Sequence, residues 1–395
     1  MDTPIACKGF TAAGVAAGLK KDGRKDLAVL YSRVPAAVAG VFTRNRVQAA
    51  PVVLDRERIK FGVCQAVIVN SGNATCCTGD QGAQDAAAMA RCVAAGLSIP
   101  ETAVLVASTG VIGQRLPIEK VQSAVPTLLK QLSPDGFEDF ARAIMTTDTV
   151  PKLVARQGQF DGQPFSLIAA AKGSGMIRPD MATLLGFAVT DLALPHDFLQ
   201  QALLGATQRS FNRITVDGDT STNDTVLLLA NGLSGVTVDT PARREQFQAL
   251  LDDTLTQLAR MLVKDGEGAT KLVEIVVRGA LSDTDARAVA DTVANSSLVK
   301  TAFFGEDANW GRILAAAGRA AVPVEPGKLE ILFDDVLMFK DGAGFGEAIE
   351  EAATRVLRQP EFTITIDLHL GQGSATVWTC DFSVDYVKIN ADYRS

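Results

Sequence analysis

Apolar residues near the start of the chain form short continuous runs. Ala66–Val69 and Ala103–Ala107 are typical of buried strands, and each run leads into a polar segment that contains glycine. Gln81–Gly96 is rich in alanine and predicts a helix between them. We therefore expect the two strands to end in loops, Asn70–Thr75 and Ser108–Gly113.

Helical spacing dominates the middle of the chain. Apolar residues recur three and four positions apart in Arg244–Lys264, and His196–Arg209 is also expected to be a helix. Further along, Lys271–Arg278 predicts a strand, Asp285–Asn295 a helix and Leu329–Phe339 another strand.

The last strongly patterned stretch alternates. Phe362–Leu370 has an apolar residue at every second position, which is the pattern of a half-buried strand. Ser374–Phe382 is expected to pair with it as a hairpin through Gly371–Gly373. Because strands and helices alternate along the chain, the pattern predicts an α/β fold. We expect layered sheets covered by helices, as in an αββα-like sandwich, with a smaller C-terminal α/β sub-domain.

Composition narrows the class of function. The chain has 395 residues, is 47% hydrophobic and carries a net charge of −7, so it can bury a substantial core and shows no basic surface for nucleic acid or anionic membrane. No uncharged apolar stretch approaches 18 residues, and the first residues do not resemble a leader. We expect a cytoplasmic protein that acts on small molecules.

Several kinds of site are disfavoured by spacing. The six cysteines form no C-x-x-C pair, and the adjacent Cys76 and Cys77 are expected to be reduced, so neither zinc nor a disulfide framework is indicated. Thr146–Thr149 and Asp217–Thr225 are rich in oxygen ligands that could bind Mg²⁺ or Ca²⁺. Such runs more often form hydrogen-bonded loops than metal sites, so we expect loops here. No phosphate-binding loop is present, so we expect no metal and no bound cofactor.

Acyl transfer through a histidine is also poorly supported, because the only histidines, His196 and His369, lie in no nucleophile motif. A threonine offers another route. If the Ala182–Thr183 bond were cut, Thr183 would gain an α-amine, whose pKa near ~7.7 to 8.0 allows it to accept the proton of its own hydroxyl. The commoner role of such a threonine is to open a buried strand, here Thr183–Thr190.

Two further segments carry suitable groups. Thr109 and Gly110, at the end of a predicted strand, offer a hydroxyl and backbone N–H groups of the kind found in an oxyanion hole, although such a pair is more often only a turn. Glu267 lies in a glycine-rich segment that closes a helix, and no structural role for its carboxylate follows from the sequence.

A series of segments, in order and over nearly the full length, matches the motifs of one known family. They are Asn70–Ala74, Ala107–Gly113, Met145–Thr149, Lys172–Thr183, Phe211–Asp224, Asp265–Lys271, Asn309–Arg312 and Ile389–Ser395. Through these segments the chain resembles the glutamate N-acetyltransferase / ornithine acetyltransferase family of arginine biosynthesis.

The resemblance implies self-cleavage between Ala182 and Thr183, giving an alpha chain of residues 1–182 and a beta chain of residues 183–395. It implies that Thr183 is the nucleophile, that Thr109 and Gly110 form the oxyanion hole, and that the substrate contacts are Thr149, Lys172, Thr183, Glu267, Asn390 and Ser395. The implied substrates are N-acetylornithine and glutamate, with acetyl-CoA as a further candidate donor. The implied assembly is a heterotetramer of two alpha and two beta chains.

This chain departs from the family pattern in two places. Arg178-Pro-Asp180 stands where many relatives have His-Pro-Asn, which changes the charge near the scissile bond, and Ser395 replaces a common threonine but keeps a hydroxyl. Two other functions stay open from the residues. One is a self-processing aminopeptidase or amidase that passes the acyl group to water, and the other is a non-catalytic amino-acid-binding protein.

Overall fold

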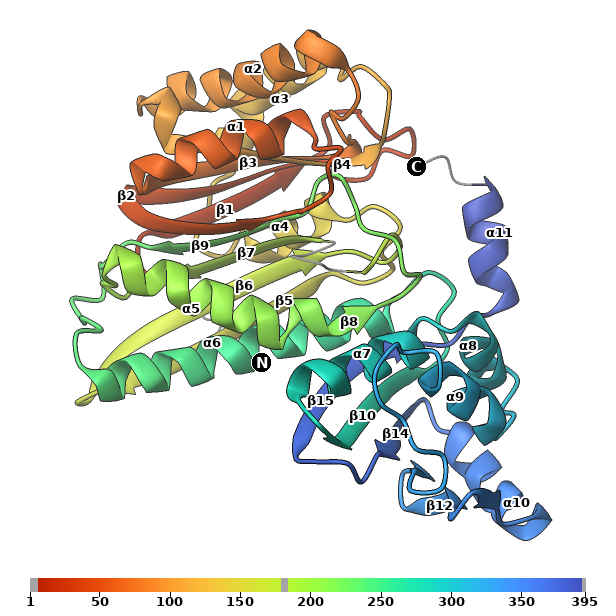
Figure 1. Ribbon diagram of the computed structural model, residues 1–395. Helices are drawn as coiled ribbons and strands as arrows, with labels where there is room; N and C mark the ends of the chain where they lie inside the picture. The colour runs from red at the N-terminus through yellow and green to blue at the C-terminus, as the bar shows by residue number, and fades with distance from the viewer. Residues whose placement is uncertain (1–5, 179–183, 393–395) are drawn as a thin grey trace. The chain divides into compact units, whose positions relative to one another are not determined.

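The computed structural model describes residues 6–178 and 184–392 (Figure 1). Contacts divide the chain into two compact units. The first takes its residues from Met1–Asn212 and Asp219–Leu262, and the second from Arg213–Gly218 and Val263–Arg394. This division differs from the expected alpha and beta chains, which therefore stay a prediction.

An eight-stranded sheet forms the centre of the first unit. The strand order is β4-β3-β2-β9-β7-β6-β5, and β1 pairs with β2. The strands are β1 (Phe10–Val15), β2 (Leu27–Phe42), β3 (Val63–Asn73), β4 (Val104–Val111), β5 (Lys152–Phe160), β6 (Gln163–Lys172), β7 (Leu185–Thr190) and β9 (Thr225–Ala230).

Strand β2 links two halves of this sheet. Its first part pairs with β1 and β3, its last part pairs with β9, and the pairing register shifts between Tyr31 and Ala36. One buried cluster contains Val69 of β3 and Leu227 of β9, so the two half-sheets pack face to face. The opposite face of β3 carries Ile68, which packs against helices.

Helices cover the outer faces of these half-sheets. α2 and α3 share the cluster of Ile68, and α5 packs on β2 and β9, which completes an αββα arrangement. The helices of this unit are α1 (Ala50–Arg58), α2 (Gly79–Leu97), α3 (Ile118–Lys130), α4 (Phe137–Ile144), α5 (His196–Arg209) and α6 (Pro241–Lys264), which ends in the second unit. Short 3₁₀ turns lie at Ile59–Phe61, Glu101–Ala103 and Phe211–Arg213.

The second unit is a smaller α/β body around a seven-stranded sheet with the order β13-β12-β11-β14-β10-β15-β8. Its strands are β8 (Ile214–Thr215), β10 (Leu272–Ala280), β11 (Glu330–Phe333), β12 (Val336–Lys340), β13 (Ala343–Gly344), β14 (Glu361–Asp367) and β15 (Gly373–Cys380). Its helices are α7 (Asp283–Ala294), α8 (Ser297–Phe304), α9 (Trp310–Ala317), α10 (Glu347–Leu357) and α11 (Val384–Asp392).

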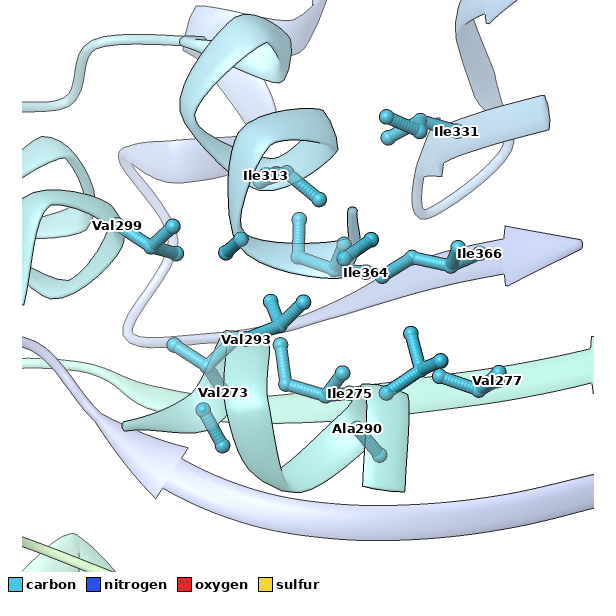
Figure 2. Packing of buried hydrophobic residues seen from close by; sticks show 14 of the residues in the cluster. Val273, Ile275, Val277, Ala290, Val293, Val299, Ile313, Ile331, Ile364 and Ile366 are labelled. Atoms are coloured by element: carbon cyan, nitrogen blue, oxygen red, sulfur yellow. The ribbon is translucent and has the colours of Figure 1, made fainter. Parts of the chain in front are cut away.

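The core of the second unit lies between this sheet and its helices. Every second residue of β10 and β14, including Ile275 and Ile364, points to the same buried cluster, which Val293 of α7 and Ile313 of α9 complete (Figure 2). The alternation noted in the sequence at Phe362–Leu370 is the sheet side of this core.

The predicted α/β class with layered sheets is confirmed, and the helix His196–Arg209 has the expected bounds. The predicted hairpin is wrong, because β10 lies between β14 and β15 and pairs with both. Leu329–Phe339 is also not one strand: a turn at Asp334, with φ 47°, divides it into β11 and β12. Within the described residues, no helix is long and apolar enough to cross a membrane.

Candidate active site

Thr109 and Gly110 lie within β4, which continues to Val111, so the loop expected at Ser108–Gly113 is largely strand. The same is true of Asn70–Asn73, which belongs to β3. The two segments pair in parallel, with an irregular register around Gly72 and Asn73. Paired strands thus stand where loops were expected, and this pairing holds the Thr109–Gly110 backbone in place.

Gly110 occupies a position that only glycine can fill. Its φ is +129°, and a Cβ atom there would lie 2.4 Å from the Gly72 carbonyl carbon. The close approach of the two backbones at this point requires the absence of a side chain. The glycine is therefore a structural requirement of the β3–β4 edge, besides the oxyanion role expected from the resemblance.

A buried polar network supports this edge. The Ser108 hydroxyl donates to the Asn70 side chain, and the Asn223 amide donates to the carbonyls of Ala74 and Ser108 at 2.7 and 2.8 Å. Asn223 comes from the run Asp217–Thr225, for which the sequence favoured a hydrogen-bonded loop. Its place two residues before β9 brings it to the strand end that carries Thr109.

Lys172 is the last residue of β6, and only 8% of its surface is exposed. Its ammonium donates to the Thr146 hydroxyl at 2.7 Å and to the Thr109 hydroxyl at 3.4 Å. The structure therefore brings together Lys172 and Thr109, two of the expected site residues. A buried cation beside an oxyanion-hole candidate is suited to holding a carboxylate or a developing negative charge.

The Asp148 carboxylate lies beside the Lys172 ammonium and balances its charge. It accepts from the Lys152 ammonium at 2.6 Å and from the Gly173 N–H at 2.7 Å, and it lies 3.9 Å from the Lys172 ammonium. Burial favours the neutral acid, but Lys172 and Lys152 outweigh it and hold the pKa of the Asp148 carboxyl well below its usual range. Sequence reasoning placed Asp148 only in an oxygen-rich run and missed this role.

Lys20 is a second cation close enough to Lys172 for the two charges to repel each other. Burial, followed by repulsion from Arg24, lowers the pKa of Lys20 to about 8, and Lys172 adds to the same repulsion. The Lys20 ammonium donates to the Met145 carbonyl at 2.7 Å.

Thr149, an expected substrate contact, is exposed in the bend between α4 and β5.

The proposed nucleophile Thr183, the scissile Ala182 and the altered Asp180 lie outside the described residues, as does Ser395. The described chain resumes at Leu184, whose carbonyl accepts from the Thr225 N–H at 3.0 Å. Leu185 then pairs with Lys172 across β6 and β7. The residue that follows the proposed nucleophile is therefore held directly beside the strand end that carries Lys172.

In the second unit, the structure brings together Glu267 and Asn390. The Asn390 amide, on α11, donates to the Glu267 carboxylate at 2.8 Å. The loop of Glu267 packs closely on the start of this helix, because the Ser383 hydroxyl donates to the Gly268 carbonyl at 2.6 Å. Only 8% of the surface of Glu267 is exposed, so its charge is held in one place.

Across residues 6–178 and 184–392, no group of three or more His, Cys, Asp or Glu side chains is placed to hold a metal ion. Cys76 and Cys77 are both free thiols, and their sulfur atoms are 3.7 Å apart.

Known proteins are similar to this chain over nearly its whole length. The ArgJ family model matches residues 11–395. The arginine biosynthesis bifunctional protein ArgJ of Geobacter sulfurreducens is 53% identical over 98% of this chain and 99% of its own length. The protein of the same name from Syntrophotalea carbinolica is 51% identical over 99% of this chain and its full length.

A solved structure agrees with this match. The crystal structure of arginine biosynthesis bifunctional protein ArgJ from Bacillus halodurans is 42% identical, with a TM-score of 0.50, and covers 52% of this chain and 98% of the solved chain. The match of the family model over nearly all residues, together with relatives at half identity over their full length, leads to one conclusion. The chain belongs to the ArgJ family and is an enzyme of arginine biosynthesis.

Proposed function

We propose that the protein cuts its own chain between Ala182 and Thr183 and then moves an acetyl group from N-acetylornithine to glutamate through an acetyl-Thr183 intermediate. The observation that carries this proposal is the convergence of the buried Lys172 ammonium on the Thr109 hydroxyl. This convergence lies at the strand end that pairs with Leu185, two residues after the proposed nucleophile.

The reaction proceeds in two halves. The Thr183 hydroxyl attacks the acetyl carbonyl while its own α-amine takes the proton, and the same proton then passes to the departing nitrogen as ornithine leaves. Thr109 and Gly110 stabilise the negative oxygen of the tetrahedral intermediate, a role worth typically about 2.7 to 4 kcal/mol per donor. The amino group of glutamate then attacks the ester carbonyl, the α-amine of Thr183 takes its proton and returns it to the Thr183 oxygen, and N-acetylglutamate leaves.

Charged groups in the structure suit amino-acid substrates. Lys172 and its neighbour Lys20 offer positive charge to a substrate carboxylate, and the Glu267 carboxylate offers a partner for a substrate ammonium. Thr149, Asn390 and Ser395 are the remaining proposed substrate contacts. The proposed chemistry needs no cofactor.

Self-cleavage has independent support from the solved relative. Because the Bacillus halodurans chain is matched over 98% of its length by 52% of this chain, that solved chain is about half as long as this one. A chain of that size fits one product of a cut near the middle.

We extend the proposal to a heterotetramer of two alpha and two beta chains and to acetyl-CoA as a second donor. We also propose a cytoplasmic setting, where six free thiols stay reduced.

A matched set of transfer assays tests this function. N-acetylornithine and acetyl-CoA are each offered as donor, with glutamate or water alone as acceptor, and N-acetylglutamate and free acetate are both measured. We expect N-acetylglutamate to form from N-acetylornithine and to require glutamate. Release of acetate at a rate that glutamate does not change would instead identify an amidase.

The comparison of the two donors shows whether the enzyme also transfers the acetyl group of acetyl-CoA. N-acetylglutamate formed from acetyl-CoA shows a bifunctional enzyme, whereas transfer from N-acetylornithine alone shows one that only recycles the acetyl group. Light scattering of the cleaved protein measures the assembly, and a mass of two alpha and two beta chains is expected.

A further inference from the structure

Cys76 and Cys77 are two neighbouring thiols that the proposed reaction does not use. Their sulfur atoms are 3.7 Å apart and share a hydrogen bond. Cys76 has no exposed surface, whereas Cys77 is exposed to solvent. Redox-sensing cysteines commonly have this arrangement, in which an accessible thiol is oxidised first and then condenses with a second thiol beside it.

The backbone around this pair has an unusual conformation. Thr75 has φ 50° and Cys77 has φ 57°, so a residue in the left-handed region lies on each side of Cys76. Such values are uncommon outside glycine and are costly for the β-branched Thr75. The turn therefore keeps this conformation only because the surrounding contacts hold it.

Hydrogen bonds join the turn to the end of β4. The Ala74 N–H donates to the Val111 carbonyl, and the Gly113 N–H donates to the Cys76 carbonyl, both at 3.0 Å. The turn thus lies alongside the segment that contains Thr109–Gly110, the candidate oxyanion hole. A change in the Cys76 backbone acts directly on that segment.

The Cys76 sulfur also contacts the polar network that supports this edge. It hydrogen-bonds with the Thr222 side chain, and the Thr222 hydroxyl donates to the Asn223 side chain at 2.7 Å. Asn223 in turn donates to the Ser108 carbonyl. Burial, followed by the neighbouring Cys77, raises the pKa of the Cys76 thiol against the opposing effect of Thr222. Cys77 is therefore the thiol that an oxidant in solution reaches first.

We propose that hydrogen peroxide joins Cys76 and Cys77 in a disulfide, and that this bond disturbs the end of β4 that carries Thr109 and Gly110. The Cys77 sulfur attacks one peroxide oxygen and the O–O bond breaks, which gives a sulfenic acid and one water. The Cys76 sulfur then attacks the Cys77 sulfur, the S–O bond breaks, and the hydroxyl leaves as a second water with the Cys76 proton. The two thiols lose two electrons, which the peroxide gains.

The new bond changes the backbone because the two cysteines are adjacent. Consecutive Cα atoms are ~3.8 Å apart across a trans peptide, whereas disulfides usually join Cα atoms about 4.4 to 6.8 Å apart. The carbonyl group of Cys76, which accepts the Gly113 N–H, belongs to the small ring that the disulfide closes. Strained and exposed disulfides are also easily reduced, so the modification is reversible.

The test treats the purified protein with hydrogen peroxide, blocks the remaining free thiols and maps the peptides by mass spectrometry. We expect the peptide that contains both cysteines to lose two hydrogen atoms, and dithiothreitol to restore them. Amide hydrogen exchange in residues 108–113 should become faster in the oxidised protein, because the hydrogen bonds to the turn are weakened. Acetyl transfer should fall by about tenfold or more, because loss of one oxyanion-hole donor typically costs about 10²- to 10³-fold in kcat.

Single substitutions separate this pair from the other thiols. Cys77→Ser should keep its exchange rates and its activity in peroxide. Cys76→Ser leaves Cys77 without a partner, so Cys77 should proceed to the sulfinic acid, which dithiothreitol does not reverse. Cys92→Ser is the matched control, because Cys92 is a partly exposed thiol on α2 in the same unit. Its response to peroxide should equal that of the wild type.

Three results overturn the proposal: oxidised wild type without a bond between Cys76 and Cys77, that bond with unchanged exchange in residues 108–113, or a Cys77→Ser variant whose exchange responds like the wild type. Only the expected loss of acetyl transfer rests on the proposed function. A protein that transfers no acetyl group before oxidation refutes that function, whereas the peptide masses and the exchange rates still decide this inference.

Discussion

Asp148 and its two lysines show how single residues position the proposed site. Both Asp148 and Lys152 have no exposed side-chain surface, so each charge depends on the other for compensation. Lys172 is the member of the group that reaches Thr109. The resemblance pointed to Lys172. The side chains that hold Lys172 in place could not be predicted from the sequence, because Asp148 and Lys152 come close to it only through strand pairing and burial.

Asp148→Asn is expected to destabilise the protein by about 3 to 5 kcal/mol at neutral pH, the usual cost of leaving a buried charge unpaired. The folded-state pKa of Asp148 is depressed, so its stabilising contribution is present above the unfolded value near ~3.9 and is lost as pH falls through the folded value. Denaturant unfolding at pH 7 and near pH 3 measures both. An equal difference between wild type and variant at the two pH values would contradict this account.

Lys172→Met is expected to raise KM for glutamate by about tenfold or more, because a charge-assisted hydrogen bond contributes about 1.5 to 3 kcal/mol. Steady-state transfer kinetics provide the measurement. Lys60→Met is the control, since the Lys60 side chain is 65% exposed and pairs with Glu57 on the surface, where such pairs contribute little. Equal KM values for the two variants would remove Lys172 from the substrate contacts.

At the scale of elements, the sequence predicts what is local. The helix His196–Arg209 and the strand β10 follow from the spacing of apolar residues. The pairing of β10 between β14 and β15 does not, because a loop of suitable length joins β14 to β15 directly and nothing local excludes a hairpin. Ser108–Gly113 was expected to be a loop because it combines polar residues with glycine, yet pairing with β3 keeps its first residues, as far as Val111, in an extended strand.

The contact between the Glu267 loop and α11 gives a prediction at this scale. A Cβ atom on Gly268 would lie 2.5 Å from the Tyr386 backbone nitrogen, so Gly268→Ala should displace the start of α11 and break the bond between Asn390 and Glu267. We expect kcat/KM for N-acetylornithine to fall at least tenfold.

Gly327→Ala provides the control within the same unit, because a Cβ atom there meets nothing within 4 Å. Cleavage of the chain should be normal in both variants, since this contact lies in the second unit and the residues around Leu184 lie in the first. Full activity of Gly268→Ala would show that the placement of α11 does not matter for transfer.

At the scale of the whole molecule, the proposed cut does not separate the fragments. β6 precedes the cut and β7 follows it, and the two strands pair over six residues, from Leu167–Thr190 to Lys172–Leu185. The cluster between the half-sheets also contains Ile168 from one fragment and Phe187 from the other. Breaking one peptide bond leaves this pairing and burial intact.

The cleaved protein should therefore migrate as one species in gel filtration and as two bands, of 182 and 213 residues, on a denaturing gel. Separation of the fragments should require a denaturant concentration that also unfolds the first unit. Fragments that separate on dilution alone would show that the paired strands do not hold the molecule together.

Intact mass spectrometry of the 183–395 fragment shows whether Thr183 carries the acetyl group. After incubation with N-acetylornithine, this fragment should gain one acetyl group, peptide mapping should place the group on Thr183, and glutamate should remove it. Cleaved and folded enzyme that turns over N-acetylornithine without any acetylated fragment, or with the acetyl group on another residue, would contradict the account.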